Sequence, residues 1–230
     1  MPGRTYNPLQ IRGEFAPDGR YVVEEDCELY RFRTTAKQGD VLDEMIGLTL
    51  PDTGIRAAAM AHMRETWWNG PPRAQIFVPF GESCTLGAGE GRGGDTRSRG
   101  VPCHRCRTRA DKDWAPPHAD FHPKSENGVR KIPVRNEDTI RVHESYWDLY
   151  DDVASQGTVK NRVIAIAERA DIDRRVTPHD LRDTFGTLLA LKDFGPYKIR
   201  DLMGHANLDE ALDYIKLAGQ HVQHEFDKKW

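Results

Sequence analysis

The sequence predicts a mainly α-helical domain of the α+β class, with a small antiparallel β-sheet and an inserted segment rich in cysteine and histidine. In the C-terminal half, apolar residues recur at helical spacing and are divided by residues that start and stop helices. In the middle of the chain, a short apolar run at 76–78 predicts a strand. Further on, the turn residues 126–128 separate two extended runs and predict a β-hairpin.

Composition limits the kind of protein this is. The chain has 230 residues, of which 38% are hydrophobic and 30% charged, so it can bury a sizeable core. No apolar run approaches the roughly 18 residues of a membrane span, and the N-terminus lacks the apolar core of a signal peptide. We therefore expect a cytoplasmic protein. The formal net charge of −3 argues against a generally basic surface, so any phosphate site should be a local basic patch.

The chain divides into three regions. Residues 1–38 are polar and weakly patterned, and we expect them to be weakly structured or peripheral. The main domain spans 39–218 and is interrupted by a Gly/Arg-rich insertion at about 81–118. Residues 219–230 form a C-terminal tail.

The first half of the main domain predicts two helices and the hairpin. An apolar face begins after Gly39, and Pro51 ends this first helix. A second helix is expected from about 54 to 67, with Arg56 at its start, where backbone N–H groups also favour an anion. In the hairpin, residues 121–124 should pair with 129–134.

The second half predicts five helices. They are expected at about 143–153, 158–170, 178–192, 197–203 and 208–218. Thr177 can cap the third of them, with Pro178 at its first helical position and Asp180 beside the free N–H groups. Gly204 should end the fourth helix.

Six separated side chains carry the chemistry needed to break a phosphodiester without a metal. Arginines hold the anionic oxygens, a phenol attacks phosphorus, and an ammonium or imidazolium moves protons. Taken singly, each has a structural alternative, such as a surface salt bridge, a solvated lysine or a half-buried tyrosine. The candidate catalytic residues are Arg56, Lys124, His179, Arg182, His205 and Tyr214.

The order of these residues resembles that of the tyrosine recombinases, or phage integrases. The matching stretches are TGIRAAAMAHM, HPKSENGVRKIPV, TPHDLRDTFGTLLA and LMGHANLDEALDYIKL, and they cover about residues 40–218. An HxxR motif alone is weak. Six roles in the right order, with His205 and Tyr214 nine positions apart, are far more specific.

The resemblance implies a tyrosine recombinase catalytic-domain fold and a reaction. Tyr214 would attack the phosphodiester to give a 3′-phosphotyrosyl linkage, and His179 would accept the phenol proton. Lys124 would protonate the leaving 5′ hydroxyl, with Arg130 and Lys131 as rival donors. Neither ATP nor a catalytic metal would take part.

The resemblance also implies double-stranded DNA as the partner, with a tetramer on DNA and a monomer in solution. Many tyrosine recombinases carry a separate helical DNA-clamping domain at the N-terminus. About 38 residues are too few for such a domain, so the sequence departs from the family pattern there.

The insertion contains a candidate structural zinc site. Cys103 and Cys106 form a CxxC pair, with Cys84 upstream and histidines downstream, and thiolates with imidazole suit tetrahedral zinc. A cytosolic protein rarely keeps disulfides, which favours a metal over a bridge. We expect Cys84, Cys103, Cys106 and one histidine, with His122 as the candidate. The alternative is a set of free thiols.

Other functions stay open from the sequence. A type IB topoisomerase uses a similar site, although the LMGH segment and the compact size favour a recombinase. A catalytically weak or inactive DNA-binding relative, a zinc-stabilised module acting with a partner, is the second class. A metal-dependent nuclease would need carboxylates placed around a catalytic ion, and no convincing set is present.

Overall fold

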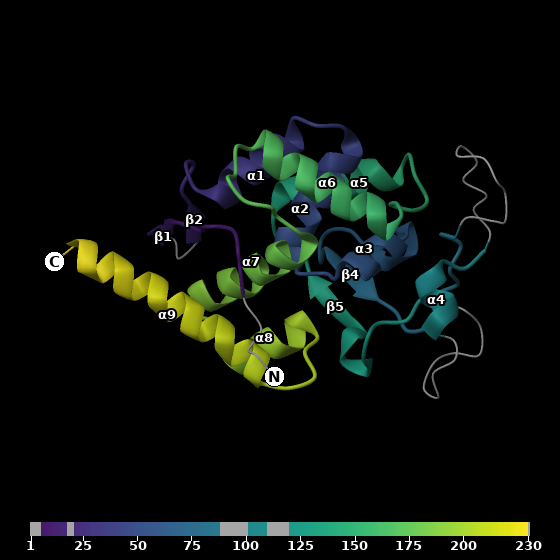
Figure 1. Cartoon of the computed structure of the whole chain (residues 1–230). Coiled ribbons are helices and arrows are strands. Elements are labelled where there is room, and N and C mark those ends of the chain that lie inside the picture. Colours follow the sequence, from purple (N-terminus) through teal and green to yellow (C-terminus); the bar gives the residue numbers. More distant parts are fainter. Residues whose placement is uncertain (1–5, 18–20, 88–100, 110–119, 230) are drawn as a thin grey trace.

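A computed structural model describes residues 6–17, 21–87, 101–109 and 120–229, with backbone alone from 220 onward. Helices dominate, and two small antiparallel sheets accompany them (Figure 1), which confirms the predicted class. The described helices are α1 (Glu28–Lys37), α2 (Val41–Thr53), α3 (Ala57–His62), α4 (His104–Arg109), α5 (Glu137–Trp147), α6 (Gln156–Arg169), α7 (Pro178–Leu191), α8 (Pro196–Met203) and α9 (Asp209–Lys229). The described strands are β1 (Gly13–Phe15), β2 (Tyr21–Val23), β3 (Trp68–Asn69), β4 (Gln75–Val78) and β5 (Arg130–Pro133), and short 3₁₀ turns are η1 (Glu65–Trp67) and η2 (Glu126–Gly128).

Helix α2 lies at the centre of the main core, where it contacts α1, α5, α6 and α7. Its residues from 45 to 51 are buried on every side, as expected of a helix surrounded by others. The predicted end at Pro51 is wrong, because the helix continues to Thr53 and stops at Gly54, which has φ 57°. Burial of this last turn offsets the hydrogen bond that proline cannot make.

The second predicted helix is shorter than expected. Gly54 ends α2 instead of opening a new helix, and Arg56 is the N-cap of the short α3. The chain becomes extended at Met63 and then forms η1. The prediction of one helix from 54 to 67 is therefore wrong, because this segment forms the short helix α3 and the separate 3₁₀ turn η1.

The predicted hairpin has a different partner. Strand β5 pairs antiparallel with β4, placing Ile132 opposite Ile76, and residues 126–128 form the 3₁₀ turn η2. Phe121 instead makes an isolated bridge with Glu82. Because Ile76 and Ile132 are both fully buried, β4 offers β5 an apolar face that 121–124 does not. The sheet thus closes across the insertion, in the order β3-β4-β5.

The N-terminal segment belongs to the main core, although the sequence predicted a peripheral one. Leu9 and Ile11 are buried there together with one face of α1. That face carries Leu29, Phe32 and Ala36, which recur at helical spacing. Arg33, on the same helix, also forms an ion pair with Asp52 of α2.

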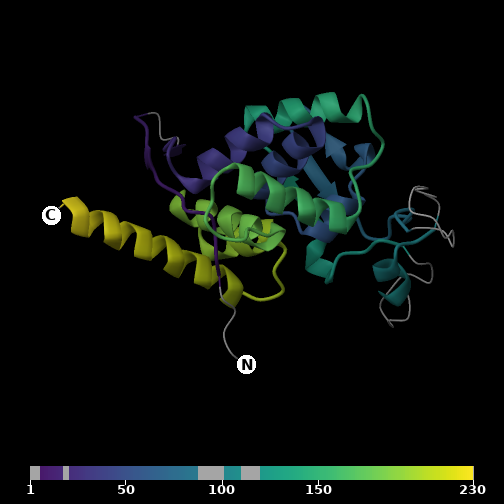
Figure 2. The same cartoon turned by 45° about the horizontal axis from the view of Figure 1, so that its top comes forward.

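The C-terminal helices form a second apolar cluster against α7. Helices α7, α8 and α9 contribute the buried residues Phe185, Leu189, Ile199, Met203, Ala211 and Tyr214. Helices α6, α7 and α8 lie within two residues of their predicted bounds. The helix predicted at about 143–153 is wrong at both ends, because α5 begins after the cap Asn136 and ends at Trp147. Helix α9 extends past the predicted end at 218 to Lys229, and its far end projects from the body (Figures 1 and 2). Among the described residues, no helix is sufficiently long and apolar to cross a membrane.

Candidate active site

A cleft of about 640 Å³ brings together four of the six candidate catalytic residues. Arg56 lies at the start of α3, and Lys124 precedes the η2 turn. His179 and Arg182 both come from the first turns of α7. All four line the cleft, although their positions span more than half of the sequence.

The cleft has the charge of an anion site. The described residues that line it include two histidines, His122 and His179, and none is acidic. Its lysines and arginines are Arg56, Arg105, Lys124, Arg130, Lys160 and Arg182. A local basic site of this kind, in a chain with a formal net charge of −3, matches the sequence expectation.

The turns at Gly54 and Gly204 position Arg56 and Arg182, the two arginines predicted to bind a phosphate. Arg182 is only 2% exposed and donates to the carbonyls of Gly54 and Met203. Arg56 donates to the Gly204 carbonyl at 3.2 Å. Gly54 and Gly204 have φ 57° and 64°, the left-handed conformation that favours glycine. The ends of α2 and α8 therefore set the positions of both guanidinium groups.

Arg130 is a third arginine of the cleft, which the sequence raised only as a rival proton donor. Its Nε donates to the Leu202 carbonyl at 2.8 Å, and one terminal nitrogen donates to the Gly128 carbonyl at 3.1 Å. Burial, and then the charge of Arg56, lower the pKa of Arg130 to about 9. Residues two positions apart on a strand point to the same side, so the apolar Ile132 indicates from the sequence that Arg130 also points inward.

Lys124 remains exposed at the mouth of the cleft. The buried Pro123 precedes it and packs against Gly128, so the backbone there is fixed while the ammonium is in solvent. Lys131, the other rival donor, is exposed on β5 and does not line the cleft. Among these lysines, the geometry favours Lys124.

The start of α7 fixes His179 beside Arg182. Thr177 is the N-cap, as predicted, and it forms a capping box with Asp180, in which the Thr177 backbone N–H and hydroxyl each donate to the Asp180 carboxylate at 2.7 Å. His179 and Arg182 are one helical turn apart and face the same cleft. His179 is exposed, so its imidazole can exchange protons with a ligand or with water.

Tyr214 and His205 lie behind the cleft and do not line it. Tyr214 is fully buried, and its hydroxyl donates to the Asp183 carboxylate at 2.9 Å. Its ring lies against Gly186, where an added Cβ would be 2.6 Å from the phenol carbon. His205 stacks on this ring at 5.9 Å, and its Nε2 lies 3.3 Å from the Glu210 carboxylate. Along α7, the residues that contact the phenol (Asp183 and Gly186) follow the cleft residues His179 and Arg182 at i, i+3, i+4 and i+7 spacing, so they share one face of the helix.

The cysteine insertion contributes a second group of side chains, next to the cleft. His62, Cys84, Cys103 and Cys106 have potential ligand atoms that all lie within 4.8 Å of one another, so the group could hold a metal. The histidine in this group is His62, in place of the expected His122. His62 ends α3, far from the cysteines in sequence, and no local spacing signal marked it.

His122 occupies a different place. It is buried, its Nδ1 lies 3.0 Å from the Pro123 carbonyl oxygen, and it lines the cleft. The expected ligand His122 therefore lies outside the Cys/His group. The direction of the polypeptide at 121–123, set by the Phe121–Glu82 bridge, explains the difference.

Comparison with known proteins shows a partial family match and a shared fold. The family model described as "Phage integrase family" matches residues 136–221. Tyrosine recombinase XerC of Listeria monocytogenes serotype 4a (strain HCC23) is 27% identical over 101 residues, which cover 42% of this chain and 34% of that protein. The chain therefore matches about a third of that relative's length.

Solved structures share the fold at low sequence identity. A XerA recombinase has a TM-score of 0.58 at 18% identity, over 97% of this chain and 66% of that one. The Tn1549 transposon integrase in complex with circular intermediate DNA has a TM-score of 0.53 at 19% identity, over 80% and 58%. XerH bound to its difH substrate before cleavage has a TM-score of 0.52 at 15% identity, over 82% and 48%.

Residues 136–221 thus match the phage integrase family, and the chain shares the fold of the XerA recombinase over 97% of its length.

Proposed function

We propose that the protein is a site-specific DNA recombinase, which cleaves and rejoins strands through a 3′-phosphotyrosyl intermediate without ATP or a catalytic metal. One observation carries the proposal. The cleft assembles Arg56, Lys124, His179 and Arg182, and Tyr214 of α9 packs on Gly186 of α7, one turn beyond Arg182. Double-stranded DNA is the proposed partner, since the Tn1549 integrase and XerH, which share the fold, are described in complex with DNA.

The arginines supply charge where it develops. A phosphodiester in the cleft would present its non-bridging oxygens to Arg56 and Arg182, whose positions the glycine turns fix before binding. Hydrogen bonds to charged groups contribute about 1.5–3 kcal/mol each. Because a pentacoordinate phosphorane carries more negative charge than the diester, part of this stabilisation falls on the transition state.

The protons follow the positions of the other groups. Lys124 is proposed to protonate the departing 5′ oxygen, because it is the exposed ammonium beside the η2 turn. His179 is proposed to accept the phenol proton, and His205 to donate to a phosphate oxygen after rearrangement. The energy of the diester remains in the phosphotyrosyl bond, so a second 5′ hydroxyl can reseal the strand.

The buried phenol implies a resting conformation. Tyr214 must leave Asp183 and the second apolar cluster before it can reach a phosphorus in the cleft. A movement of α9 would move the phenol, because Tyr214 is part of that helix and the helix follows the Gly204 turn. Assembly of a tetramer on DNA is proposed as the event that selects the active conformation.

The second candidate is a DNA-binding relative with little or no catalysis. The buried, hydrogen-bonded Tyr214 is the observation that favours it. Both candidates predict DNA binding at the cleft, so binding alone does not separate them. The covalent step does.

The test uses a DNA duplex with a nick close to the cleavage site, so that the short cleaved product diffuses away and traps the intermediate. The recombinase should form a denaturation-resistant protein–DNA adduct that survives EDTA and disappears in Tyr214→Phe. Tyr197→Phe is the matched control, because Tyr197 is 64% exposed on α8, and it should retain the adduct. DNA binding without any adduct under these conditions would establish the second candidate instead.

A further inference from the structure

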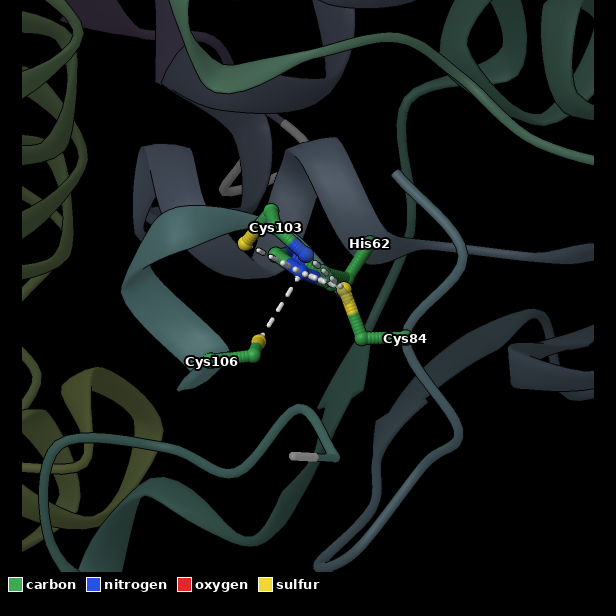
Figure 3. A group of neighbouring side chains, drawn as sticks. All are labelled: His62, Cys84, Cys103 and Cys106. Atoms are coloured by element: carbon green, nitrogen blue, oxygen red, sulfur yellow. Dashed lines mark hydrogen bonds between the residues drawn. The ribbon is translucent and has the colours of Figure 1, made fainter. Parts of the chain in front are cut away.

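The Cys/His group lies where the insertion meets α3. The His62 imidazole is at the centre, and the sulfur atoms of the three cysteines surround it (Figure 3). His62 Nε2 is 3.2 Å from Cys84 Sγ, 3.7 Å from Cys103 Sγ and 3.4 Å from Cys106 Sγ. Three segments of chain, around residues 62, 84 and 103–106, thus converge on one small volume.

These separations suit a tetrahedral ion. Zinc binds sulfur at about 2.3 Å and imidazole nitrogen at about 2.0–2.1 Å, so tetrahedral angles place nitrogen and sulfur ligands about 3.5 Å apart. The three observed nitrogen–sulfur distances, 3.2–3.7 Å, bracket this value. Three thiolates and one imidazole form a closed, structural type of zinc site, with no position left for a substrate.

The second nitrogen of His62 is held as metal-binding histidines require. Its Nδ1 is 2.6 Å from the Ala58 carbonyl, and donation to that oxygen leaves Nε2 as the nitrogen with a lone pair facing the sulfurs. The ring also stacks on Phe121, with centroids 4.6 Å apart. Orientation and tautomer are therefore set by the protein before any ion binds.

Hydrogen bonds and burial also hold the three cysteines in place. The Cys103 backbone N–H donates to Cys84 Sγ at 3.3 Å, a contact that stabilises a thiolate. On either side of Cys84, Arg64 donates to the Ser83 carbonyl at 2.6 Å and to the Thr85 hydroxyl at 3.2 Å. Cys106, one turn after Cys103, is buried in α4.

The three thiols are crowded. Their sulfur atoms and the ligand nitrogen of His62 all lie within 4.8 Å of one another. Three sulfur atoms so close together repel one another once ionised, and a divalent cation removes that repulsion.

We propose that His62, Cys84, Cys103 and Cys106 bind one Zn²⁺, which fastens the insertion to α3 and places Arg105 at the cleft. Arg105 lies between the two cysteines of the CxxC pair and lines the cleft, where it donates to Gln156 of α6 at 2.9 Å. Zinc binding stands on the geometry of the four ligands alone. The role of Arg105 in holding DNA rests on the proposed function.

The metal test needs no DNA. Full-length protein purified without chelators should contain about one zinc per chain by elemental analysis. After zinc removal, Co²⁺ should give the visible bands of a tetrahedral ion together with thiolate-to-cobalt charge-transfer absorption. His62→Ala and Cys106→Ser should each weaken Co²⁺ binding more than about 100-fold, which exceeds the roughly 10- to 100-fold cost of losing only a ligand's outer hydrogen bond. The matched controls His122→Gln and Cys27→Ser should bind cobalt as the unmodified chain does.

Alkylation of the unmodified protein keeps the test independent of folding in the variants. With zinc bound, mass spectrometry should find Cys84, Cys103 and Cys106 protected from iodoacetamide, and chelation should expose all three together. Cys27, which is buried elsewhere, should react equally in both states. A chain that binds neither zinc nor cobalt, that holds iron, that forms a disulfide among these cysteines, or that loses cobalt with His122 and not with His62 would overturn the proposal.

DNA affinity then tests the consequence separately. Zinc removal and Arg105→Gln should each weaken binding of a duplex by about 3- to 10-fold, because one phosphate contact is lost. Arg107→Gln is the matched control, because Arg107 is exposed on the same helix and does not line the cleft. If the unmodified protein contains zinc but neither zinc removal nor Arg105→Gln weakens DNA binding, the metal site stands and Arg105 lies outside the DNA interface.

Discussion

Arg182 joins two parts of the backbone and also lines the cleft, a combination that requires the several donors of a guanidinium group. Its guanidinium donates to the carbonyls of Gly54 and Met203, so it joins the end of α2 to the end of α8. The same planar group faces the cleft that should receive a phosphate. A lysine keeps the charge but cannot reach two carbonyls and an anion at once.

Arg182→Lys should therefore lower both stability and cleavage. We expect a loss of about 1–3 kcal/mol in the free energy of unfolding, since a buried carbonyl is left without its donor. Adduct formation should fall about 100-fold or more, the effect of removing one aimed donor from a transition state. Urea unfolding and the nicked-duplex assay measure the two effects. Arg200→Lys, at an exposed arginine of α8 paired with Asp201, should change neither; cleavage unaffected by Arg182→Lys would contradict the assigned role.

His143 provides a pH-dependent term in stability. It is fully buried, accepts a hydrogen bond from Trp147 Nε1 at 3.2 Å on Nδ1, and lies 2.9 Å from the Thr49 hydroxyl through Nε2. The indole can only donate, so the Nε2 atom carries the proton. Burial lowers the pKa of His143 to about 3.

The sign of the pH effect follows from that shift. The unfolded imidazole has a pKa of about 6.5, so protonation favours the unfolded chain as the pH falls from there toward 3, and stability is retained above pH 6.5. We expect His143 to cost on the order of 3 kcal/mol at pH 4 relative to pH 7. Urea unfolding at several pH values should show the decline, and His143→Gln should flatten it. An equal slope in the variant would assign the effect to other groups.

At the scale of an element, α7 contributes to both the cleft and the site of the phenol: His179 and Arg182 line the cleft, and Tyr214 packs on Gly186 one turn later. Gly186 allows the Tyr214 ring to lie directly on the helix backbone, where an added Cβ would meet ring atoms at 2.6–2.7 Å. Backbone and ring are both confined, since Tyr214 is fully buried. A methyl group at 186 must therefore displace the ring.

Gly186→Ala should destabilise the protein by about 1–3 kcal/mol, the usual cost of overpacking a core. Gly157→Ala is the matched control in α6, because the nearest atom to its added Cβ is a Ser155 hydroxyl 3.7 Å away. There, alanine should stabilise by about 0.4–1 kcal/mol, through the smaller entropy of the unfolded chain. Urea unfolding compares the two. If Gly186→Ala changed the free energy of unfolding in the same direction and by as much as Gly157→Ala, the Tyr214 ring would not rest on Gly186.

How far the sequence predicts each element depends on whether its determinants are local. Helix α7 could be predicted closely, because Thr177 and Asp180 cap it within one turn. The partner of β5 could not, because β4 lies some fifty residues upstream and the turn at 126–128 offered a nearer false partner. The same reasoning explains the candidate sites: family order pointed to Arg56 and Arg182, whereas His62 joins the cysteines only through tertiary packing.

At the scale of the whole molecule, two hydrophobic clusters share helix α7, which contributes Leu181 and Leu188 to one and Phe185 and Leu189 to the other. The main core surrounds α2, and the smaller cluster of α7, α8 and α9 contains Tyr214. The Gly204 turn touches both, because its carbonyl accepts from Arg56 and it directly precedes His205. A shift of α9 about this turn could deliver the phenol to the cleft while both arginines stay in place.

The most direct measurement identifies the residue that becomes linked to DNA. The adduct trapped on a nicked duplex would be digested with nuclease and protease, and the modified peptide sequenced by mass spectrometry. The expected product is a nucleotide joined through its 3′ phosphate to Tyr214. A linkage to a different tyrosine, to a serine or to a 5′ phosphate would contradict the proposed chemistry.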